Sequence, residues 1–334
     1  MIQIFEENGH QVDKIKCEDV TSSYIKDNRD KFFIVSNFMR LNKGPKEELM
    51  KVNYALYEHD HKYVINRNPA AFADLKVPDQ QLDNLDLYKN ANAVFCQSKI
   101  HKRAIDTNVQ TKETINLGSS LWSPEFLDKI EKIAVNKTKK AAIVEERNPI
   151  KQQQLAENFC VENNIEYDLI RADTPLELAT ILSQYEFLVF FPKVLETFSR
   201  VAVEAKMVGC KLYTNNLLGA ASEDWFKEDR SFVINQMKKA RTKTYKSFLD
   251  VINNGNKSIQ SSSDITVILN AYRRPYNLEK QIESIRNQTV KPNQIWLWIN
   301  QHEDNKDFDF SELKVDRVFH NDYNWKYYGR FAAA

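Results

Sequence analysis

The stretch Phe190–Cys210, FFPKVLETFSRVAVEAKMVGC, contains the strand, loop and helix that decide the fold. The apolar run Phe187–Phe191 predicts a buried strand, and residues 199–208 predict an amphipathic helix. Glu196 precedes this helix and Glu204 lies within it, with seven residues between them. That spacing places the two carboxylates roughly 10 Å apart, which suits the two ends of one ligand better than a shared metal ion.

Short apolar runs alternate with helical patterns on both sides of this stretch. Such alternation predicts open, mainly parallel α/β sheets. Because the alternation starts again near residue 140, we expect two Rossmann-like domains in tandem, with a ligand crevice between them. The other runs predicted as strands are Lys31–Val35, Val52–Tyr57, Ala93–Cys96, Ala141–Val144, Tyr167–Ile170 and Lys211–Thr214.

The chain beyond residue 236 predicts a helix, a linker and a further unit. Apolar residues recur at helical spacing over Met237–Ile252, which predicts a helix that crosses back over the first domain. A polar stretch with Gly and Ser follows and predicts a flexible linker, after which Ile265–Leu269 and Ile295–Ile299 predict strands. The expected boundaries are 1–120 for the N-terminal domain, 121–254 for the C-terminal domain with its crossing helix, 255–263 for the linker and 264–334 for the last unit.

Composition excludes several classes of function. The formal net charge is +1, from 47 Lys and Arg against 46 Asp and Glu, so there is no electrostatic case for nucleic acid or an anionic membrane. No apolar run reaches the roughly 18 residues that span a bilayer, and the four cysteines form no C-x-x-C pair. We therefore expect no integral membrane segment, no nucleic-acid partner, no metal and a cytoplasmic location.

Taken alone, two glutamates at this spacing are most simply solvated surface charges. Their context, however, resembles the E-x7-E donor-site signature of retaining glycosyltransferases of the GT-B type, family 4 in particular, with TFS in place of the family's Gly-Phe-Gly. The resemblance implies that Glu196 contacts the hydroxyls of the donor sugar and Glu204 the ribose hydroxyls. The backbone of Thr197, Phe198 and Ser199 would approach the sugar and the phosphates. Either hydroxyl residue, Thr197 or Ser199, is expected to cap the helix.

Two cations are the candidates for the diphosphate. In ERNPIKQQQ, Asn148 and Pro149 predict a helix start, so Arg147 and Lys151 flank a helix N-terminus. A pair of surface cations is the alternative interpretation. Their position resembles that of the family's Arg and Lys after the first strand of the donor domain, with a spacing one residue shorter. The resemblance implies that these cations and helix dipoles, rather than a metal, neutralise the leaving group.

The first domain offers a histidine. Glu58, His59, Asp60 and His61 follow the predicted strand Val52–Tyr57, and two histidines without a third ligand are a weak metal signal. His59 and Asp60 instead resemble the family's crevice-facing His and Asp, which implies that His59 hydrogen-bonds the donor sugar.

The start of the chain also resembles the family. MIQIFEENGHQVDKI resembles the end of the family's first helix and its second strand, so the family's first strand and the glycine-bearing loop after it have no counterpart in this sequence. We expect either a shortened domain or a start further upstream, and acceptor handling is the function that this difference affects most.

Residues 264–334 resemble the opening of a different glycosyltransferase fold, the GT-A type of family 2. Asp307 and Asp309 spell D-x-D but fall between the second and third strands, so we interpret them as loop charges. Asn300 stands where that family has an Asp that contacts the base. This unit is therefore expected to be a partial, inactive module.

Together these patterns predict a GT-B glycosyltransferase of the hexosyltransferase kind, active in polysaccharide biosynthesis, in residues 1–254. Its donor would be a nucleotide-diphosphate sugar, and its acceptor a glycan, a lipid-linked sugar or a protein. It would act with retention and without a metal or other cofactor. Two alternatives stay open: a sugar-nucleotide epimerase of the same architecture, and a non-catalytic module that binds a sugar nucleotide or a glycan.

Overall fold

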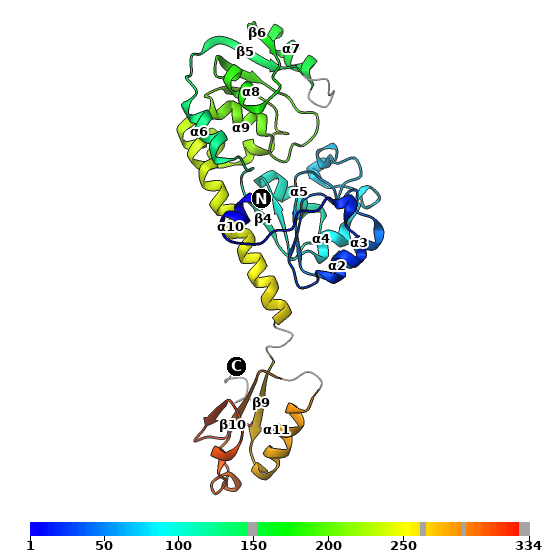
Figure 1. Ribbon diagram of the computed structural model, residues 1–334, viewed down its shortest axis with the longest axis vertical. Helices are drawn as coiled ribbons and strands as arrows, with labels where there is room; N and C mark the ends of the chain where they lie inside the picture. Colours follow the sequence, from blue (N-terminus) through cyan, green and yellow to red (C-terminus); the bar gives the residue numbers. More distant parts are fainter. Residues whose placement is uncertain (146–151, 261–264, 289–291, 327–334) are drawn as a thin grey trace. The chain divides into compact units, whose positions relative to one another are not determined.

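The computed structural model describes residues 1–145, 152–260, 265–288 and 292–326. The chain divides into two compact units, Met1–Ile252 and Asn253–Ala334. The first unit contains two four-stranded parallel sheets, which define a first and a second lobe, and the second unit contains a three-stranded parallel sheet (Figure 1). The predicted α/β class, with two parallel sheets in tandem, is therefore confirmed.

The strands of the first lobe lie side by side in sequence order, β1-β2-β3-β4. Because parallel crossovers are right-handed, a sheet in this order receives its connecting helices on one face. Leu56 and Val94 accordingly pack with residues of α2 to α5, whereas Ala55 and Phe95 face the opposite side. The elements are β1 Phe33–Val35, β2 Tyr54–Tyr57, β3 Ala93–Cys96, β4 Thr114–Asn116, α2 Ser22–Asp27, α3 Lys43–Leu49, α4 Leu85–Asn90 and α5 Lys99–Asn108.

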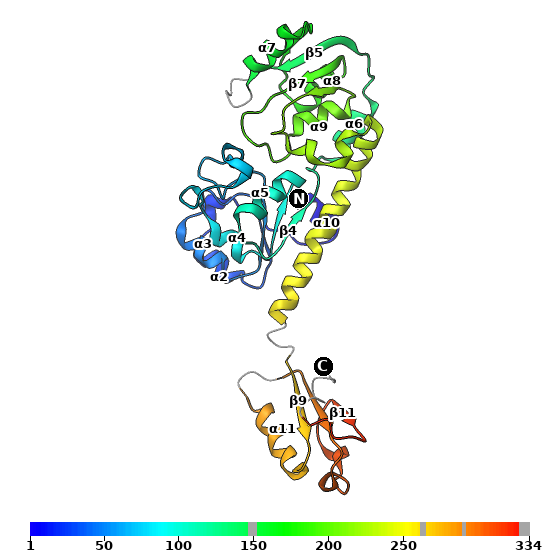
Figure 2. The same cartoon turned by 180° about the vertical axis from the view of Figure 1, so that it is seen from behind.

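The opposite face of this sheet is covered by α1 (Ile2–Glu7) and by the long helix α10 (Arg230–Gln260). Phe248 of α10 stacks on Phe95 of β3, with ring centroids 3.6 Å apart. Met237, nearer the start of the same helix, packs in the core of the second lobe. The helix therefore crosses from one lobe to the other, as the sequence predicts (yellow in Figure 2).

Helix α10 is longer than its apolar pattern. It begins at Arg230 and continues to Gln260, so residues 255–260, predicted as part of a linker, are helical instead. Once a helix exists, each added residue gains a hydrogen bond without a new nucleation cost, and this offsets the weak helix preference of Asn and Gly. Among the helices of the described residues, none has both the length and the apolarity needed to cross a bilayer.

The sheet of the second lobe has the order β6-β5-β7-β8. The chain passes from β5 to β6 on one side and then returns past β5 to β7 on the other, so the connections from β5 and β6 run in opposite directions across the sheet. Helix α7 packs on one face, and α8 and α9 pack on the other. This reversal makes the carboxyl ends of β5 and β7 a topological switch point. The elements are α6 Pro124–Lys132, β5 Thr138–Val144, α7 Gln153–Glu162, β6 Tyr167–Ile170, α8 Pro175–Leu182, β7 Tyr185–Val189, α9 Arg200–Met207 and β8 Lys211–Tyr213.

Two local features differ from the sequence prediction. Strand β4 was not predicted, because its three residues are too few to show an alternating pattern. Residues 10–16, which resemble the start of a strand, form no strand in the structure, since Gly9 with φ of 82° ends α1 and no neighbouring strand pairs with this segment.

The second unit is a small parallel α/β module. Its strands have the order β11-β10-β9, and α11 (Leu278–Arg286) packs on the face formed by Ile295, Leu297 and Ile299. Asn300, after β10, is buried and donates to Asn270 Oδ1 at 2.7 Å while it accepts from the backbone N–H of Trp325 at 3.0 Å. The strands are β9 Thr266–Ala271, β10 Gln294–Ile299 and β11 Arg317–His320. The assignment of this unit to the GT-A type stays a prediction.

Candidate active site

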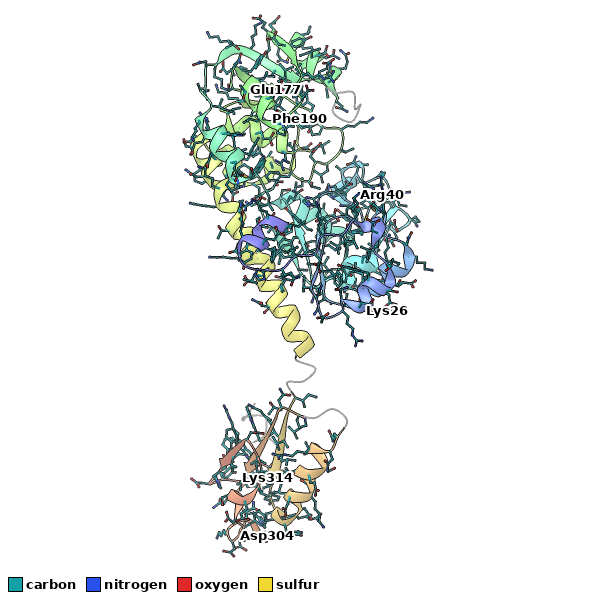
Figure 3. The ribbon with its side chains drawn as sticks, in the orientation of Figure 1. Lys26, Arg40, Glu177, Phe190, Asp304 and Lys314 are labelled. Atoms are coloured by element: carbon teal, nitrogen blue, oxygen red, sulfur yellow. The ribbon has the colours of Figure 1, made fainter. Side chains whose placement is uncertain are left out.

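The β7–α9 loop, residues 190–199, leaves the second sheet at the switch point. In open parallel sheets ligands bind at this edge, because loop amides and helix N-termini converge there. Phe190, labelled in Figure 3, begins the loop, and Glu196 lies half-buried within it. The N–H of Glu196 donates to the carbonyl of Leu217 at 2.9 Å, and Glu196 forms a parallel bridge with Leu218. The predicted sugar-binding carboxylate therefore lies in an anchored loop directly before α9.

The end of this loop is conformationally strained. Ser199 precedes α9 with φ of 74° and ψ of 95°, and its side chain makes no capping hydrogen bond. The predicted cap by Ser199 is therefore wrong, because an N-cap residue needs an extended backbone to direct its oxygen at the helix. A positive φ favours glycine, so the side chain of Ser199 adds strain at this position. The predicted cap by Thr197 is also wrong, since its hydroxyl is used elsewhere.

Gly219 fixes the loop from the side of the second lobe. A Cβ atom at Gly219 would lie 2.4 Å from the carbonyl oxygens of both Glu196 and Thr197. Any side chain there would push the loop outward. The close approach therefore requires glycine at this position.

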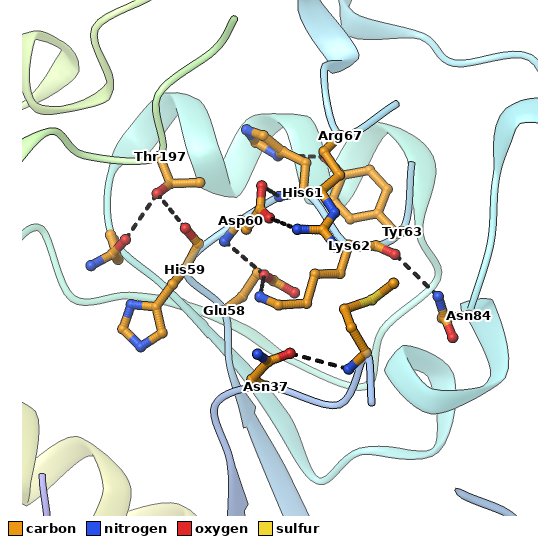
Figure 4. Close-up of polar contacts among 12 residues, drawn as sticks. Asn37, Glu58, His59, Asp60, His61, Lys62, Tyr63, Arg67, Asn84 and Thr197 are labelled. Atoms are coloured by element: carbon orange, nitrogen blue, oxygen red, sulfur yellow. Dashed lines mark hydrogen bonds and ion pairs between the residues drawn. The ribbon is translucent and has the colours of Figure 1, made fainter. Parts of the chain in front are cut away.

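The first lobe holds the same loop from the other side (Figure 4). The Thr197 hydroxyl lies 3.0 Å from the carbonyl oxygen of His59 and 2.9 Å from Oε1 of Gln97. Ser98 Oγ donates to the carbonyl of Thr197 at 2.7 Å, and the N–H of Leu195 donates to Asn68 Oδ1 at 3.1 Å. Two predicted site segments, 138 residues apart in sequence, thus meet at one hydrogen bond.

His59 follows β2 at the carboxyl edge of the first sheet. Its ring packs against Tyr57, with centroids 4.0 Å apart, while the residue as a whole is exposed. Partial withdrawal of the ring from water, followed by the nearby Lys62 charge, lowers the pKa of His59 to about 4. His59 is therefore neutral at pH 7 and can exchange hydrogen bonds with uncharged hydroxyl groups.

Asp60, the partner of His59 in the family pattern, is occupied within the first lobe. Its carboxylate accepts from Arg67 Nη1 at 2.6 Å and from the backbone N–H of His61 at 2.9 Å (Figure 4). These contacts fix the turn that carries His59. Asp60 therefore positions the turn that carries His59, and its carboxylate is already bonded to protein groups.

A buried ion pair beneath His59 was missed at the sequence level. Lys62 Nζ lies 2.6 Å from Glu58 Oε1, with side-chain exposures of 5% and 0%. Tyr88 donates its hydroxyl hydrogen to the second oxygen of Glu58, and the N–H of Asp60 donates to the first at 2.8 Å. Burial raises the pKa of Glu58, and the Lys62 charge opposes this shift. Glu58 and Lys62 are four residues apart, and this spacing in the sequence is equally common for pairs of surface charges.

Glu204 lies in α9 and is buried. Its carboxylate accepts a hydrogen bond of 2.7 Å from Nε1 of Trp122 and lies 3.6 Å from Nε of Arg200. Burial raises the pKa of Glu204, and the Trp122 hydrogen bond and the Arg200 charge oppose that rise. Glu204, the residue predicted to bind the ribose hydroxyls, is thus hydrogen-bonded to an indole ring, and its side chain is 3% exposed.

A pocket of about 420 Å³ opens beside Trp122 and Arg200. It lies where α6, α8 and α9 begin, and the first two of these helices are capped by Ser123 and Thr174. The Arg200 guanidinium lies over the Trp122 ring at 4.7 Å, so a flat aromatic surface and a cation line the same space. The sequence signal for Arg200 is its place directly after TFS. The other lining residues are Leu121, Glu125, Phe126, Lys129, Pro175 and Leu176.

The remaining predicted site residues lie partly outside the described structure. Arg147 and Lys151 fall in residues 146–151, which the structure does not describe; they follow β5, whose last residue is Val144. Phe198 is buried in the core of the second lobe, so only its backbone is available to a ligand. Within the described ranges, no group of three or more His, Cys, Asp or Glu side chains is arranged to hold a metal ion.

A second set of contacts joins the lobes at the N-terminus of α5. The carboxylate of Glu223 accepts from the backbone N–H of Lys99 at 2.7 Å and from Asn116 Nδ2 at 2.9 Å. Ser222 Oγ accepts from the N–H of Ile100 at 3.1 Å. Ser222 ends the short 3-10 turn Gly219–Ser222 after β8, and Glu223 lies between it and the next such turn, Asp224–Lys227. A carboxylate thus satisfies helix N–H groups across the lobe boundary.

Comparisons with known proteins give matches only among solved structures. No protein-family model matches the chain. No curated protein matches it either.

The solved structures with similar backbones are distant in sequence. A UDP-forming α,α-trehalose-phosphate synthase from Burkholderia xenovorans is 10% identical over 72% of this chain and 75% of its own, with a TM-score of 0.41. HepE from Anabaena in complex with UDP and glucose is 14% identical over 72% and 81%, with a TM-score of 0.35. An α-glucosyltransferase in complex with UDP and DNA is 11% identical over 75% and 93%, with a TM-score of 0.38. At these levels of similarity, the neighbours do not establish a shared function.

Proposed function

We propose that residues 1–252 form a GT-B glycosyltransferase that moves a sugar, with retention, from a nucleotide-diphosphate sugar to an acceptor. The observation that carries the proposal is the contact between Thr197 and His59, since it joins the two segments predicted to hold the donor sugar. Such a meeting is unexpected for the alternative in which the glutamates are solvated surface charges.

The nucleoside would occupy the pocket beside Trp122 and Arg200. The base would lie against the indole face and the guanidinium, both of which offer flat surfaces for stacking. Glu204 would receive a ribose hydroxyl after Trp122 shifts its hydrogen bond, because the carboxylate is already desolvated and a neutral hydroxyl can replace the indole N–H.

The diphosphate would lie at the switch point, beside the N-terminus of α9. Helix N–H groups and Arg200 carry positive charge there, and Arg147 and Lys151 follow the neighbouring strand β5 in sequence. As the glycosidic bond breaks, charge grows on the leaving phosphate oxygen. Groups already positioned around that oxygen stabilise the transition state more than the ground state, and no metal is needed in this proposal.

The donor sugar would lie between Glu196 and His59. Glu196 would accept hydrogen bonds from sugar hydroxyls, and the neutral His59 ring would bond a hydroxyl near the reacting carbon. The contacts of the β7–α9 loop with the first lobe would exclude water from this space, which favours transfer over hydrolysis.

A non-catalytic sugar-nucleotide-binding module is the second candidate. The observation in its favour is the engagement of Glu204, whose carboxylate already has a strong partner in Trp122. Turnover separates the two functions, because a binding module would retain the nucleotide without breaking the glycosidic bond.

The test is donor turnover by the full chain. The protein is incubated with UDP-glucose, UDP-galactose, UDP-N-acetylglucosamine and GDP-mannose, each with a mixture of free sugars as acceptor probes, with and without EDTA, and released nucleoside diphosphate is measured. We expect release that EDTA does not change and that Glu196→Gln lowers at least about a hundredfold. Lys193→Gln, in the same loop but exposed, is the matched control. Binding without release supports the second candidate, and an epimerised donor contradicts both.

A further inference from the structure

We propose that the Thr197 hydroxyl is a positioning group that makes the alignment of Glu196 depend on closure of the two lobes. The inference rests on the proposed function, and it adds a residue that links donor binding in the second lobe to the state of the first.

The β7–α9 loop is held from both lobes at once. On the second lobe, Gly219 packs against the carbonyl groups of Glu196 and Thr197, and Leu217 accepts from the Glu196 N–H. On the first lobe, the partners of Thr197 are the carbonyl of His59, the amide of Gln97 and the hydroxyl of Ser98. Glu196 is adjacent to Thr197, so its backbone is held on one side by contacts within the second lobe and on the other by contacts that cross to the first lobe.

The conformation of Ser199 shows that this loop is under constraint. Its φ of 74° lies in a region that a residue with a side chain rarely adopts. Such a conformation persists only when the surrounding contacts over-determine it. Loss of the first-lobe contacts would let the segment between Glu196 and Ser199 relax, and the direction of Glu196 would change with it.

The lobe interface does not depend on Thr197 alone. Glu223 and Ser222 hold the N-terminus of α5 through contacts in which Thr197 takes no part. Removal of the Thr197 hydroxyl therefore leaves the lobes joined while the β7–α9 loop loses its side-chain link to His59 and Gln97. This separation makes a local test possible.

The contact of the Thr197 hydroxyl with the first lobe has a chemical consequence. With the lobes apart, Glu196 is misaligned for transfer, and water can reach the donor sugar. With the lobes together, the donor sugar is oriented for transfer to an acceptor. Thr197 thus favours transfer over hydrolysis, and it acts through Glu196 rather than by touching the reacting atoms.

The experiment compares Thr197→Val, which replaces the hydroxyl by a methyl group, with Thr197→Ser, which retains it. The full chain is assayed with the donor of highest turnover and with free glucose, galactose, mannose and N-acetylglucosamine as acceptor probes. We measure kcat, the KM for the donor, and the fraction of donor sugar that is released to water rather than joined to a probe. For Thr197→Val we expect kcat to fall roughly tenfold or more, KM for the donor to stay within about twofold, and the hydrolysed fraction to rise. Thr197→Ser should restore values within about twofold of the unchanged protein.

Two further variants control for folding. Thr180→Val removes an exposed hydroxyl on α8 that donates to the carbonyl of Leu176, and it should change no kinetic parameter. Thr197→Ala removes the same hydroxyl as Thr197→Val without a methyl group near Gln97, and it should reproduce the split between kcat and KM. A merely structural role would lower the active fraction, and with it the apparent kcat, but would leave the hydrolysed fraction unchanged.

The outcomes separate the two proposals. If the unchanged protein turns over a donor and Thr197→Val has the same kcat and hydrolysed fraction, this inference is overturned and the proposed function stands. If the unchanged protein releases no nucleoside diphosphate from any donor, both are overturned. If Thr197→Val and Thr197→Ala show the expected split and Thr197→Ser restores it, the inference is supported.

Discussion

Nε1 of Trp122 donates a hydrogen bond of 2.7 Å to the carboxylate of Glu204, across 82 residues of sequence. The bond joins the segment that enters α6 to the interior of α9, and it satisfies a carboxylate with little access to water. Glu204 is thus held by a partner that also lines the candidate nucleoside pocket. A ligand that reaches this carboxylate has to compete with the indole.

Trp122→Phe should destabilise the first unit. The change leaves the Glu204 carboxylate buried without its donor, so we expect the free energy of unfolding to fall by about 1–3 kcal/mol. Urea unfolding of the full chain measures the effect. In a Glu204→Leu background the same change should cost clearly less, because no carboxylate is left unsatisfied. Equal costs in the two backgrounds would show that the indole matters only for packing.

Lys62→Met should be strongly destabilising. The remaining Glu58 carboxylate would be buried without its counter-charge, which costs about 3–5 kcal/mol of unfolding free energy. Lys51→Met, which removes an ion pair with an exposed lysine, is the matched control and should cost at most about 1 kcal/mol. Chemical denaturation of both variants gives the comparison. A cost for Lys62→Met no larger than that of the control would contradict the account of a buried pair.

Stability should fall in mild acid because of His61. Burial lowers the pKa of His61 to about 4, from an ordinary value of 6.5, with Asp60 raising it and Lys62 lowering it. Below pH 6.5 the unfolded chain binds a proton that the folded chain does not, so the loss develops as pH falls from about 6.5 to about 4. It reaches about 2 kcal/mol at pH 5.

The pH dependence is checked by urea unfolding at pH 7.5 and pH 5. His101 is buried beside His61, with ring centroids 5.0 Å apart, and its pKa is lowered too, so it adds to the loss in the same direction. His61→Gln should be less stable than the unchanged chain at pH 7.5 but should lose about 2 kcal/mol less between the two values. An unchanged pH dependence in this variant would rule out His61 as its source.

Ser199→Gly should stabilise the chain. The positive φ at Ser199 costs of order 1 kcal/mol, which glycine removes, and the greater freedom of glycine in the unfolded chain offsets only part of the gain. Ser183→Gly, at a helical φ of −60°, should instead destabilise. Thermal unfolding of the two variants gives opposite signs. A lower melting temperature for Ser199→Gly would mean that the Ser199 conformation is not strained.

The fold was largely predictable because short apolar runs alternate with helical patterns along the chain. Val94 and Phe95 lie in the continuous apolar run Ala93–Cys96, which is typical of a strand buried on both faces. The order β6-β5-β7-β8 of the second sheet was not predicted, because it depends on which strands pair in the folded chain. Strand β4 escaped detection because its pairing with β3, rather than its own composition, makes it a strand. The continuation of α10 beyond Ile252 likewise depends on the helix before it.

The candidate site was predictable only where a motif carried it. Glu196 and His59 were identified from local patterns, and the structure brings their segments together. Trp122 and Gly219 were not identified, because their importance arises from contacts with residues far away in sequence. Trp122 contacts Glu204, and Gly219 contacts the β7–α9 loop. The hydroxyl of Thr197 was expected at a helix cap, and only the tertiary fold shows that it reaches the first lobe.

The most direct test of the central claim is a crystal structure of the full chain soaked with UDP. The account predicts density for the diphosphate at the carboxyl ends of β5 and β7, beside the N-terminus of α9, with the nucleoside in the pocket next to Trp122. Density for UDP at any other place would contradict it, and so would the absence of bound nucleotide both in crystals soaked with UDP and in crystals soaked with GDP at millimolar concentration.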